Sequence, residues 1–133
     1  MTEERPDPRR TNPEAAPYFD GLDRGEVMYQ RCRRCDTAIF YPRTFCPYCL
    51  ADDPQWHRSS GRGRVYTFSE VHAPPYPDDE RPSPYTIGIV EMAEGFHLFG
   101  EFVPTDSVLA VDTPVVATVL TRHGRSLLCF EVV

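Results

Sequence analysis

Four cysteines arranged in two pairs are the residues whose type and spacing most directly predict chemistry. Cys32 and Cys35 form the first Cys-x-x-Cys pair, Cys46 and Cys49 form the second, and ten residues separate the pairs. A Cys-x-x-Cys segment turns tightly enough to aim both sulfurs at one point. Two such turns on neighbouring hairpins place four thiolates in a tetrahedron, which suits zinc. The spacing therefore predicts one structural zinc ion.

The same four cysteines are compatible with three other uses. A disulfide framework is typical of secreted chains, and no hydrophobic signal segment precedes Cys32, which favours reduced cysteines and a cytoplasmic location. A redox Cys-x-x-Cys normally stands alone before a helix of a βαβ unit, and the sequence predicts no such unit. A single iron in a rubredoxin-like site uses the same ligands, so iron is the alternative to zinc.

The residue after each cysteine pair is unusual for this kind of turn. That position needs a positive φ, which glycine adopts readily, but here it is occupied by Asp36 and Leu50. Aspartate tolerates a positive φ, whereas leucine does so poorly. We therefore expect the second turn to be looser than the first or differently shaped.

Charge is distributed unevenly along the chain. All fourteen basic residues are Arg. Residues 1–64 contain eleven Arg and ten Asp or Glu (+1), and residues 65–133 contain three Arg and ten Asp or Glu (−7), which sum to −6. An acidic C-terminal half is a poor surface for a phosphate backbone. The absence of Lys also excludes lysine Schiff-base chemistry and a phosphate-binding P-loop.

The N-terminal part is expected to be a flexible tail (residues 1–17), followed by a helical arm and the zinc ribbon (residues 18–58). The tail is polar and contains four prolines. A helix is predicted over residues 18–24, with Gly25 ending it. One face of this helix carries Tyr18, Phe19 and Leu22. This face either packs against the rest of the chain, which is the commoner use, or binds a partner subunit.

Residues 59–133 are predicted to form an OB-fold domain that begins with a flexible joint at 59–63. Residues 105–111 are expected to form one helical turn, and the proline-rich loop 74–84 is either a solvated linker or a partner contact. The chain is thus predicted to be mainly β, with an N-terminal helical arm, a zinc ribbon and a five-stranded barrel. The expected barrel strands are rich in β-branched and aromatic residues: Val65–Ala73, Tyr85–Met92, His97–Val103, Val115–Arg122 and Ser126–Val132.

An ordered series of short motifs resembles a known family. Over residues 17–133 the chain is similar to proteins that join a rubredoxin-like zinc ribbon to an acyl-CoA-associated OB-fold. The resemblance is carried by Tyr-Gln-Arg-Cys at 29–32, Tyr-Pro-Arg at 41–43, Cys-Pro-Tyr-Cys at 46–49, Trp56, Ser-Gly-Arg-Gly-Arg-Val-Tyr-Thr-Phe at 60–68, His72 and Pro84-Tyr85.

The resemblance implies an accessory subunit of a CoA-thioester enzyme. The enzymes concerned are thiolase-like condensing enzymes and aldolases, and MaoC-like enoyl-CoA hydratases. Such a subunit binds the enzyme protein and helps to form or stabilise its acyl-CoA site. Acyl-CoA is therefore a possible ligand, and we expect no activity of the isolated chain.

The remaining candidate residues agree with a non-catalytic chain. The four histidines fall in no hydrolase or metalloprotease motif, and Cys129 lies in an apolar strand, where cysteine is usually inert. We expect His72 to be a hydrogen-bonding residue rather than a base. Arg43, Arg62 and Arg64 are the candidates for binding CoA phosphates, because Arg binds phosphate through two parallel hydrogen bonds; a solvated basic face is the alternative.

Two other functions fit parts of the sequence. One is a nucleic-acid-binding module in which Tyr66, Phe68, Phe99 and Phe102 stack on bases. The −7 balance of residues 65–133 argues against this function. The other is an iron redox protein, which the colour of the purified protein distinguishes from a zinc protein.

Overall fold

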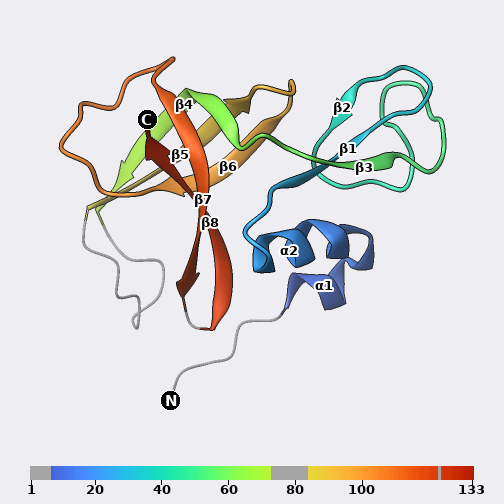
Figure 1. Ribbon diagram of the computed structural model, residues 1–133, viewed down its shortest axis with the longest axis horizontal. Coiled ribbons are helices and arrows are strands. Elements are labelled where there is room, and N and C mark those ends of the chain that lie inside the picture. Colours follow the sequence, from blue (N-terminus) through green and yellow to red (C-terminus); the bar gives the residue numbers. More distant parts are fainter. Residues whose placement is uncertain (1–6, 73–83, 123) are drawn as a thin grey trace.

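Two β-sheets of different size make up most of the chain in the computed structural model, which describes residues 7–72, 84–122 and 124–133. Figure 1 shows the smaller sheet and the larger barrel side by side, with the N-terminal helices below the junction between them. Most of the proline-rich loop 74–84 and His123 lie outside the described residues.

The N-terminal segment is helical where it was expected to be a tail. The elements are α1 (Pro8–Thr11), the 3₁₀ helix η1 (Pro13–Ala15) and α2 (Ala16–Asp23). Arg9 explains why this segment packs against α2, because its guanidinium lies 2.8 Å from the carboxylates of both Asp20 and Asp23 on that helix. The flexible-tail prediction is therefore wrong for residues 8–15. The predicted helix is present as α2, and Gly25 follows it with a φ of 77°.

The smaller sheet is the ribbon that carries the cysteines. Its strands are β1 (Met28–Arg31), β2 (Ala38–Ile39) and β3 (Gln55–Arg58), in the antiparallel order β2-β1-β3. The buried side chain of Gln30 fastens the second half of the ribbon to β1. Its carbonyl oxygen accepts from the Arg43 N–H at 2.7 Å, and its amide donates to the Arg43 carbonyl at 2.8 Å. Both polar groups of a buried amide are thus satisfied.

The larger sheet closes into a five-stranded barrel of order β4-β5-β6-β8-β7, so the mainly β fold class is confirmed. Four neighbouring strand pairs are antiparallel, and β6 and β8 pair in parallel. Residues 105–111, however, form bends and turns instead of the predicted helical turn. The strands are β4 (Arg62–Val71), β5 (Tyr85–Met92), β6 (His97–Phe102), β7 (Pro114–Arg122) and β8 (Arg125–Val132).

Ribbon, helix α2 and barrel share one hydrophobic core. Phe96, in the turn between β5 and β6, stacks on Tyr29 of β1 with ring centroids 4.8 Å apart. Phe40 of the ribbon lies 5.7 Å from the ring of Phe96 and 5.2 Å from the ring of Tyr18 on α2. Aromatic pairs at these separations stabilise a packed interface, so the ribbon is held against the barrel over a continuous apolar contact.

The linker between ribbon and barrel is held by hydrogen bonds, and the flexible joint predicted at 59–63 is wrong. The carboxylate of Glu94 accepts from the hydroxyl of Ser59 at 2.7 Å and from the backbone N–H of Ser60 at 2.8 Å. The Ser59 hydroxyl in turn accepts from the Gly61 N–H at 3.0 Å. Serine and glycine predict a flexible linker when no hydrogen-bond partner is visible nearby in the sequence. Here the Glu94 carboxylate is that partner.

None of the helices among the described residues is long and apolar enough to span a membrane.

Candidate metal centre and barrel pocket

The four cysteines predicted as zinc ligands converge at the tip of the ribbon. Their sulfur atoms all lie within 4.8 Å of one another, with 3.4 Å between Cys32 and Cys49 and 3.7 Å between Cys35 and Cys46. A tetrahedral zinc site with bonds of about 2.3 Å separates its sulfurs by about 3.8 Å, so the donor set fits. All four thiols are free, which excludes the disulfide alternative.

Both cysteine turns have the same backbone geometry. Asp36 has a φ of 60° and donates its N–H to the Cys32 carbonyl at 3.0 Å; Leu50 has a φ of 66° and donates to the Cys46 carbonyl at 2.9 Å. The expectation of a looser second turn is therefore wrong. A positive φ destabilises a leucine residue. Binding of one cation by the four converging sulfurs would offset this cost.

Hydrogen bonds favour the thiolate form at two of the cysteines. The pKa of Cys49 is lowered to about 6, chiefly because the Ala51 N–H donates to its sulfur. The pKa of Cys35 is lowered through its contact with Thr37, whereas burial raises the pKa of Cys46. Because the thiolate is the form that binds a metal, this environment suits a cation rather than four neutral thiols.

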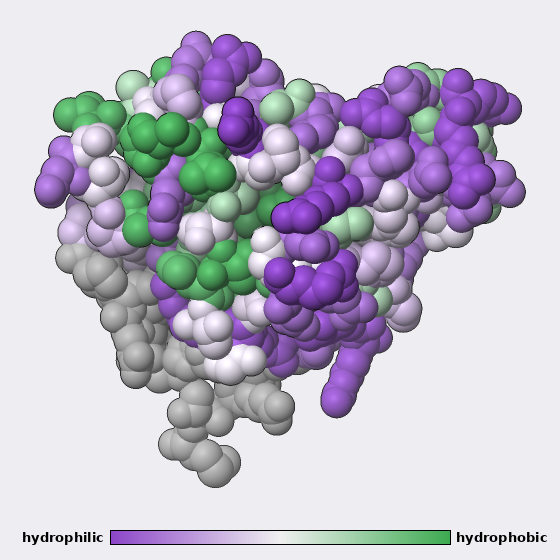
Figure 2. All heavy atoms as spheres, in the orientation of Figure 1, coloured by the Kyte–Doolittle hydropathy of each residue, from purple (hydrophilic) through white to green (hydrophobic). Residues whose placement is uncertain are grey.

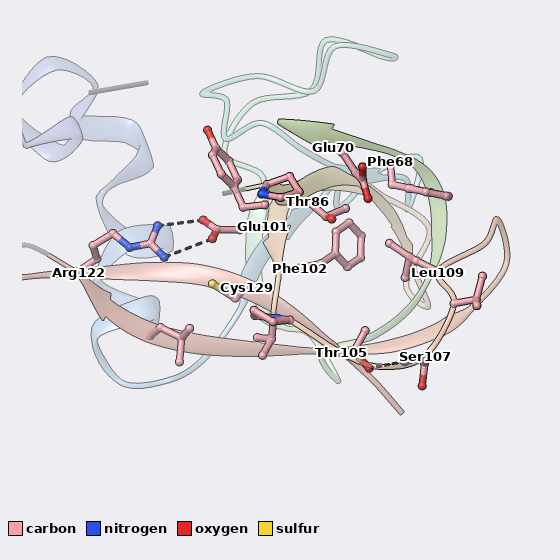
Figure 3. A pocket seen from close by; sticks show the side chains of 16 residues that line it. Phe68, Glu70, Thr86, Glu101, Phe102, Thr105, Ser107, Leu109, Arg122 and Cys129 are labelled. Carbon is pink, nitrogen blue, oxygen red and sulfur yellow. Dashed lines mark hydrogen bonds and ion pairs between the residues drawn. The ribbon is translucent and has the colours of Figure 1, made fainter. Parts of the chain in front are cut away.

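A pocket of about 500 Å³ lies where the barrel meets the segment 103–109 (Figure 3). One end holds the ion pair of Arg122 and Glu101, at 2.9 and 3.3 Å. Phe68 and Leu109 lie at the other end (Figure 3). The pocket thus combines apolar and polar side chains, with Glu70 beside Phe68 (Figure 3), and its volume is in the range of small-molecule sites, roughly 300–1,000 Å³.

The arginines predicted to bind phosphates do not come together in this pocket. Arg43 lines a hollow on the ribbon with Trp56, whereas Arg62 and Arg64 lie on β4. Arg64 forms an ion pair with Glu91 at 3.2 Å. The arginine that does line the pocket is Arg122, which sequence reasoning missed. The alternation of side chains along β7 could have assigned Arg122 to one face of that strand. The pocket itself, however, is formed by residues of five strands.

The predicted partner-binding face of the helix is mostly inside the protein. Tyr18 and Leu22 are buried in the shared core, and Phe19 is half-buried. Packing is therefore the use that the structure shows for Tyr18 and Leu22. All three side chains nevertheless line a groove of about 360 Å³ between α2 and the barrel. Partner binding therefore stays a prediction only for the surface of that groove.

The remaining sequence candidates are one cysteine and two histidines. Cys129 is buried in β8, where it also lines the barrel pocket. His72 lies 3.6 Å from the carboxylate of Glu70, and His97 lies 3.6 Å from that of Glu91. These exposed histidine–carboxylate contacts are typical of surface residues.

The four aromatic residues considered for base stacking lie on two different faces. Phe68 and Phe102 line the pocket, and Phe102 is buried. Tyr66 and Phe99 are exposed on the outer face of the barrel. Phe99 and Phe102 are three residues apart on β6 and therefore point to opposite sides of the sheet, so the four cannot form one stacking platform.

Fold and site define a zinc ribbon joined to an OB-fold barrel, and the comparisons agree. Residues 19–55 match the ChsH2 rubredoxin-like zinc ribbon domain, and residues 56–120 match the ChsH2 C-terminal OB-fold domain. The chain belongs to the ChsH2 family, also called DUF35, which confirms the resemblance found in the sequence.

Relatives carry names from scaffolds and from CoA enzymes. A DUF35 domain-containing scaffold protein of Methanocaldococcus jannaschii is 37% identical over 71% of this chain and 69% of its own length. A probable enoyl-CoA hydratase alpha subunit of Thermomonospora curvata is 32% identical over 74% of this chain. The chain spans only 31% of that subunit.

Solved structures give the same fold. The chain superposes on a chain of the Ltp2-ChsH2(DUF35) aldolase with a TM-score of 0.80 and 28% identity, covering 91% of this chain and 95% of the other. A DUF35 protein of Sulfolobus solfataricus described as having unknown function gives a TM-score of 0.66 at 14% identity, which supports the fold alone. An enoyl-CoA hydratase alpha subunit and a component of an aldolase are thus among the proteins to which this chain is similar.

Proposed function

We propose that this chain binds a thiolase-like condensing enzyme, an aldolase or an enoyl-CoA hydratase as a non-catalytic subunit, and that it contributes to the acyl-CoA site. The observation that carries the proposal is the family relationship. Relatives are named as subunits of a hydratase and of a benzoylsuccinyl-CoA thiolase, and the superposed chain comes from an aldolase that contains a DUF35 component. The hydratase and thiolase names both refer to a CoA-thioester enzyme, which is the partner that we propose.

The chain's own architecture supports a positioning role. The four-cysteine site lies at the ribbon tip, away from the pocket lining, so zinc would supply folding energy and rigidity rather than substrate chemistry. The shared aromatic core and the Glu94 hydrogen bonds hold ribbon and barrel in one arrangement. A rigid accessory protein can orient a partner's loops without contributing a nucleophile or base.

The barrel pocket is our candidate for the acyl part of the ligand. Phe68 and Leu109 offer apolar contacts to a hydrocarbon chain, whereas Glu70 beside Phe68 and the ion pair at the other end offer polar contacts. Arg43, Arg62 and Arg64 are exposed and stay candidates for the phosphates of CoA. For Arg64 this role requires exchanging the ion pair with Glu91 for a phosphate.

Co-expression with a thiolase-like or hydratase-like enzyme from the same genome tests the proposal. We expect a complex that is stable on size-exclusion chromatography, and no acyl-CoA turnover by the chain alone. Turnover by the pure chain that is lost on Cys129→Ser would contradict a non-catalytic role. If the chain binds no enzyme of these classes, the accessory role is contradicted.

A pocket-filling pair of variants tests the acyl site. Leu109→Trp is expected to lower kcat/KM of the complex for long acyl-CoA substrates more than for short ones, because the indole occupies the end of the pocket near Phe68. Val111→Trp, on the same loop but outside the pocket, is the matched control. Equal effects on long and short substrates would remove the pocket from the acyl site.

A further inference from the structure

The outer face of the barrel exposes two aromatic rings, one on β4 and one on β6, with β5 between these strands. Tyr66 of β4 is 54% exposed and Phe99 of β6 is 62% exposed. His97 connects them: its ring lies 4.6 Å from that of Tyr66, and it stands two residues before Phe99 on the same face of β6. We call Tyr66, His97 and Phe99 the aromatic ridge.

An apolar groove lies directly beside this ridge. It is the groove of about 360 Å³ between helix α2 and the barrel, and Phe99 forms part of its wall. Phe19 contributes from α2, Ile87 from β5 and Leu127 from β8. A ridge next to a groove, both built on packed elements rather than on loops, gives a surface that can interlock with a complementary one.

The charges around the ridge are already paired within the chain. The Glu91 carboxylate lies 3.2 Å from the Arg64 guanidinium and 3.6 Å from the His97 ring nitrogen. The surroundings of the ridge are therefore nearly neutral, although residues 65–133 carry a balance of −7. A neutral aromatic patch inside an acidic half does not attract a phosphate backbone, but it suits the apolar centre of a protein interface.

We propose that the aromatic ridge and the adjoining groove are the surface on which the CoA-thioester enzyme subunit docks. This inference rests on the proposed function, which supplies the occupant: a folded enzyme subunit presenting an apolar surface. Tyrosine and other aromatic side chains near the centre of an interface contribute much of its binding energy. The groove also gives the sequence-predicted helix face its role, because Phe19 lines it while Tyr18 and Leu22 form its buried base.

Two other exposed apolar regions compete with this face. One includes Val108 and Val111, 89% and 60% exposed, in the segment between β6 and β7; the other includes Tyr48, 70% exposed, at the ribbon tip. Figure 2 shows hydrophobic side chains gathered over β7, β8 and the neighbouring loop, and a mainly hydrophilic ribbon. The first region lies on the connection between β6 and β7, and the second lies in a cysteine turn. Both provide matched controls, because neither is built on a strand or helix.

The test measures the dissociation constant of the complex with a co-purified enzyme that has been identified as a thiolase-like protein, aldolase or hydratase. Phe99→Ser and Tyr66→Ser are each expected to raise Kd by about 30-fold or more, as expected for central aromatic residues. Val111→Ser and Tyr48→Ser are expected to change it by less than about threefold. Zinc content and unfolding midpoint of each variant verify that the fold is retained, which the exposure of these side chains favours.

Each result either supports or contradicts the docking surface. If the native chain captures an enzyme and the ridge variants bind it equally well, the docking surface is wrong while the proposed function stands. A loss of binding in Val111→Ser or Tyr48→Ser alone assigns docking to that other region. If the native chain binds no CoA enzyme, both proposals fail. A homodimer of the isolated chain that Phe99→Ser dissociates would assign the ridge to a second copy and contradict the inference.

Discussion

The carboxylate of Glu94 is expected to stabilise the connection between ribbon and barrel. It accepts two hydrogen bonds from the linker, at 2.7 and 2.8 Å. Hydrogen bonds to a charged group contribute about 1.5–3 kcal/mol each, and partial exposure reduces that figure. We expect Glu94→Ala to lower the free energy of unfolding by about 2 kcal/mol, or roughly 7 °C in Tm for a chain of this size. Chemical denaturation followed by circular dichroism measures the difference.

The same carboxylate predicts a pH dependence. Burial raises the pKa of Glu94, but the hydrogen bonds from Ser60 and Ser59 outweigh it, so the pKa lies below the ordinary value of 4.5. A pKa that is lower in the folded than in the unfolded state stabilises the protein at higher pH, and the contribution disappears as the pH falls through the folded value. The difference between native protein and Glu94→Gln is therefore expected to shrink as the pH falls below the ordinary value of 4.5. Zinc release at acid pH affects both proteins and cancels in the difference.

A neighbouring glutamate provides the control for this reasoning. Glu91 forms exposed contacts with Arg64 and His97, so Glu91→Ala is expected to cost less than about 1 kcal/mol. Equal destabilisation by Glu91→Ala and Glu94→Ala would refute the assignment of Glu94 as the residue that holds the linker. A difference between native protein and Glu94→Gln that stays constant from about pH 6 to pH 3.5 would refute the electrostatic part.

Two further predictions concern the metal and the barrel interior. Metal analysis of freshly reduced protein is expected to find one zinc per chain, and Cys46→Ser to lose it and to expose the ribbon to proteolysis, because bound zinc supplies folding energy; iron, or unchanged proteolysis, would contradict this. Gly100→Ala is expected to cost about 1–3 kcal/mol, because the added Cβ would lie 2.6 Å from the ring of Phe130, which is fully buried. Val108→Ala, on an exposed loop, is the control, and equal unfolding midpoints for the two variants would show that the barrel interior adapts freely.

Local patterns in the sequence were sufficient for the metal centre and for the barrel strands. Two Cys-x-x-Cys segments determine the positions of their own sulfurs, because each turn spans only four residues. A composition rich in β-branched and aromatic residues predicted β5 with its observed bounds, Tyr85–Met92. The ordered series of motifs also identified the family, which the comparisons confirm.

Contacts between distant segments decided the rest. Proline and polar residues at 7–15 predict a tail, yet Arg9 folds them against α2 through Asp20 and Asp23. Serine and glycine at 59–61 predict flexibility, yet Glu94, more than thirty residues away, holds them. The barrel pocket needs five strands and one loop at once, and Arg122 belongs to it only because β7 passes Glu101 of β6. Such pairings follow from the tertiary packing of the chain, which brings together residues that local sequence patterns do not connect.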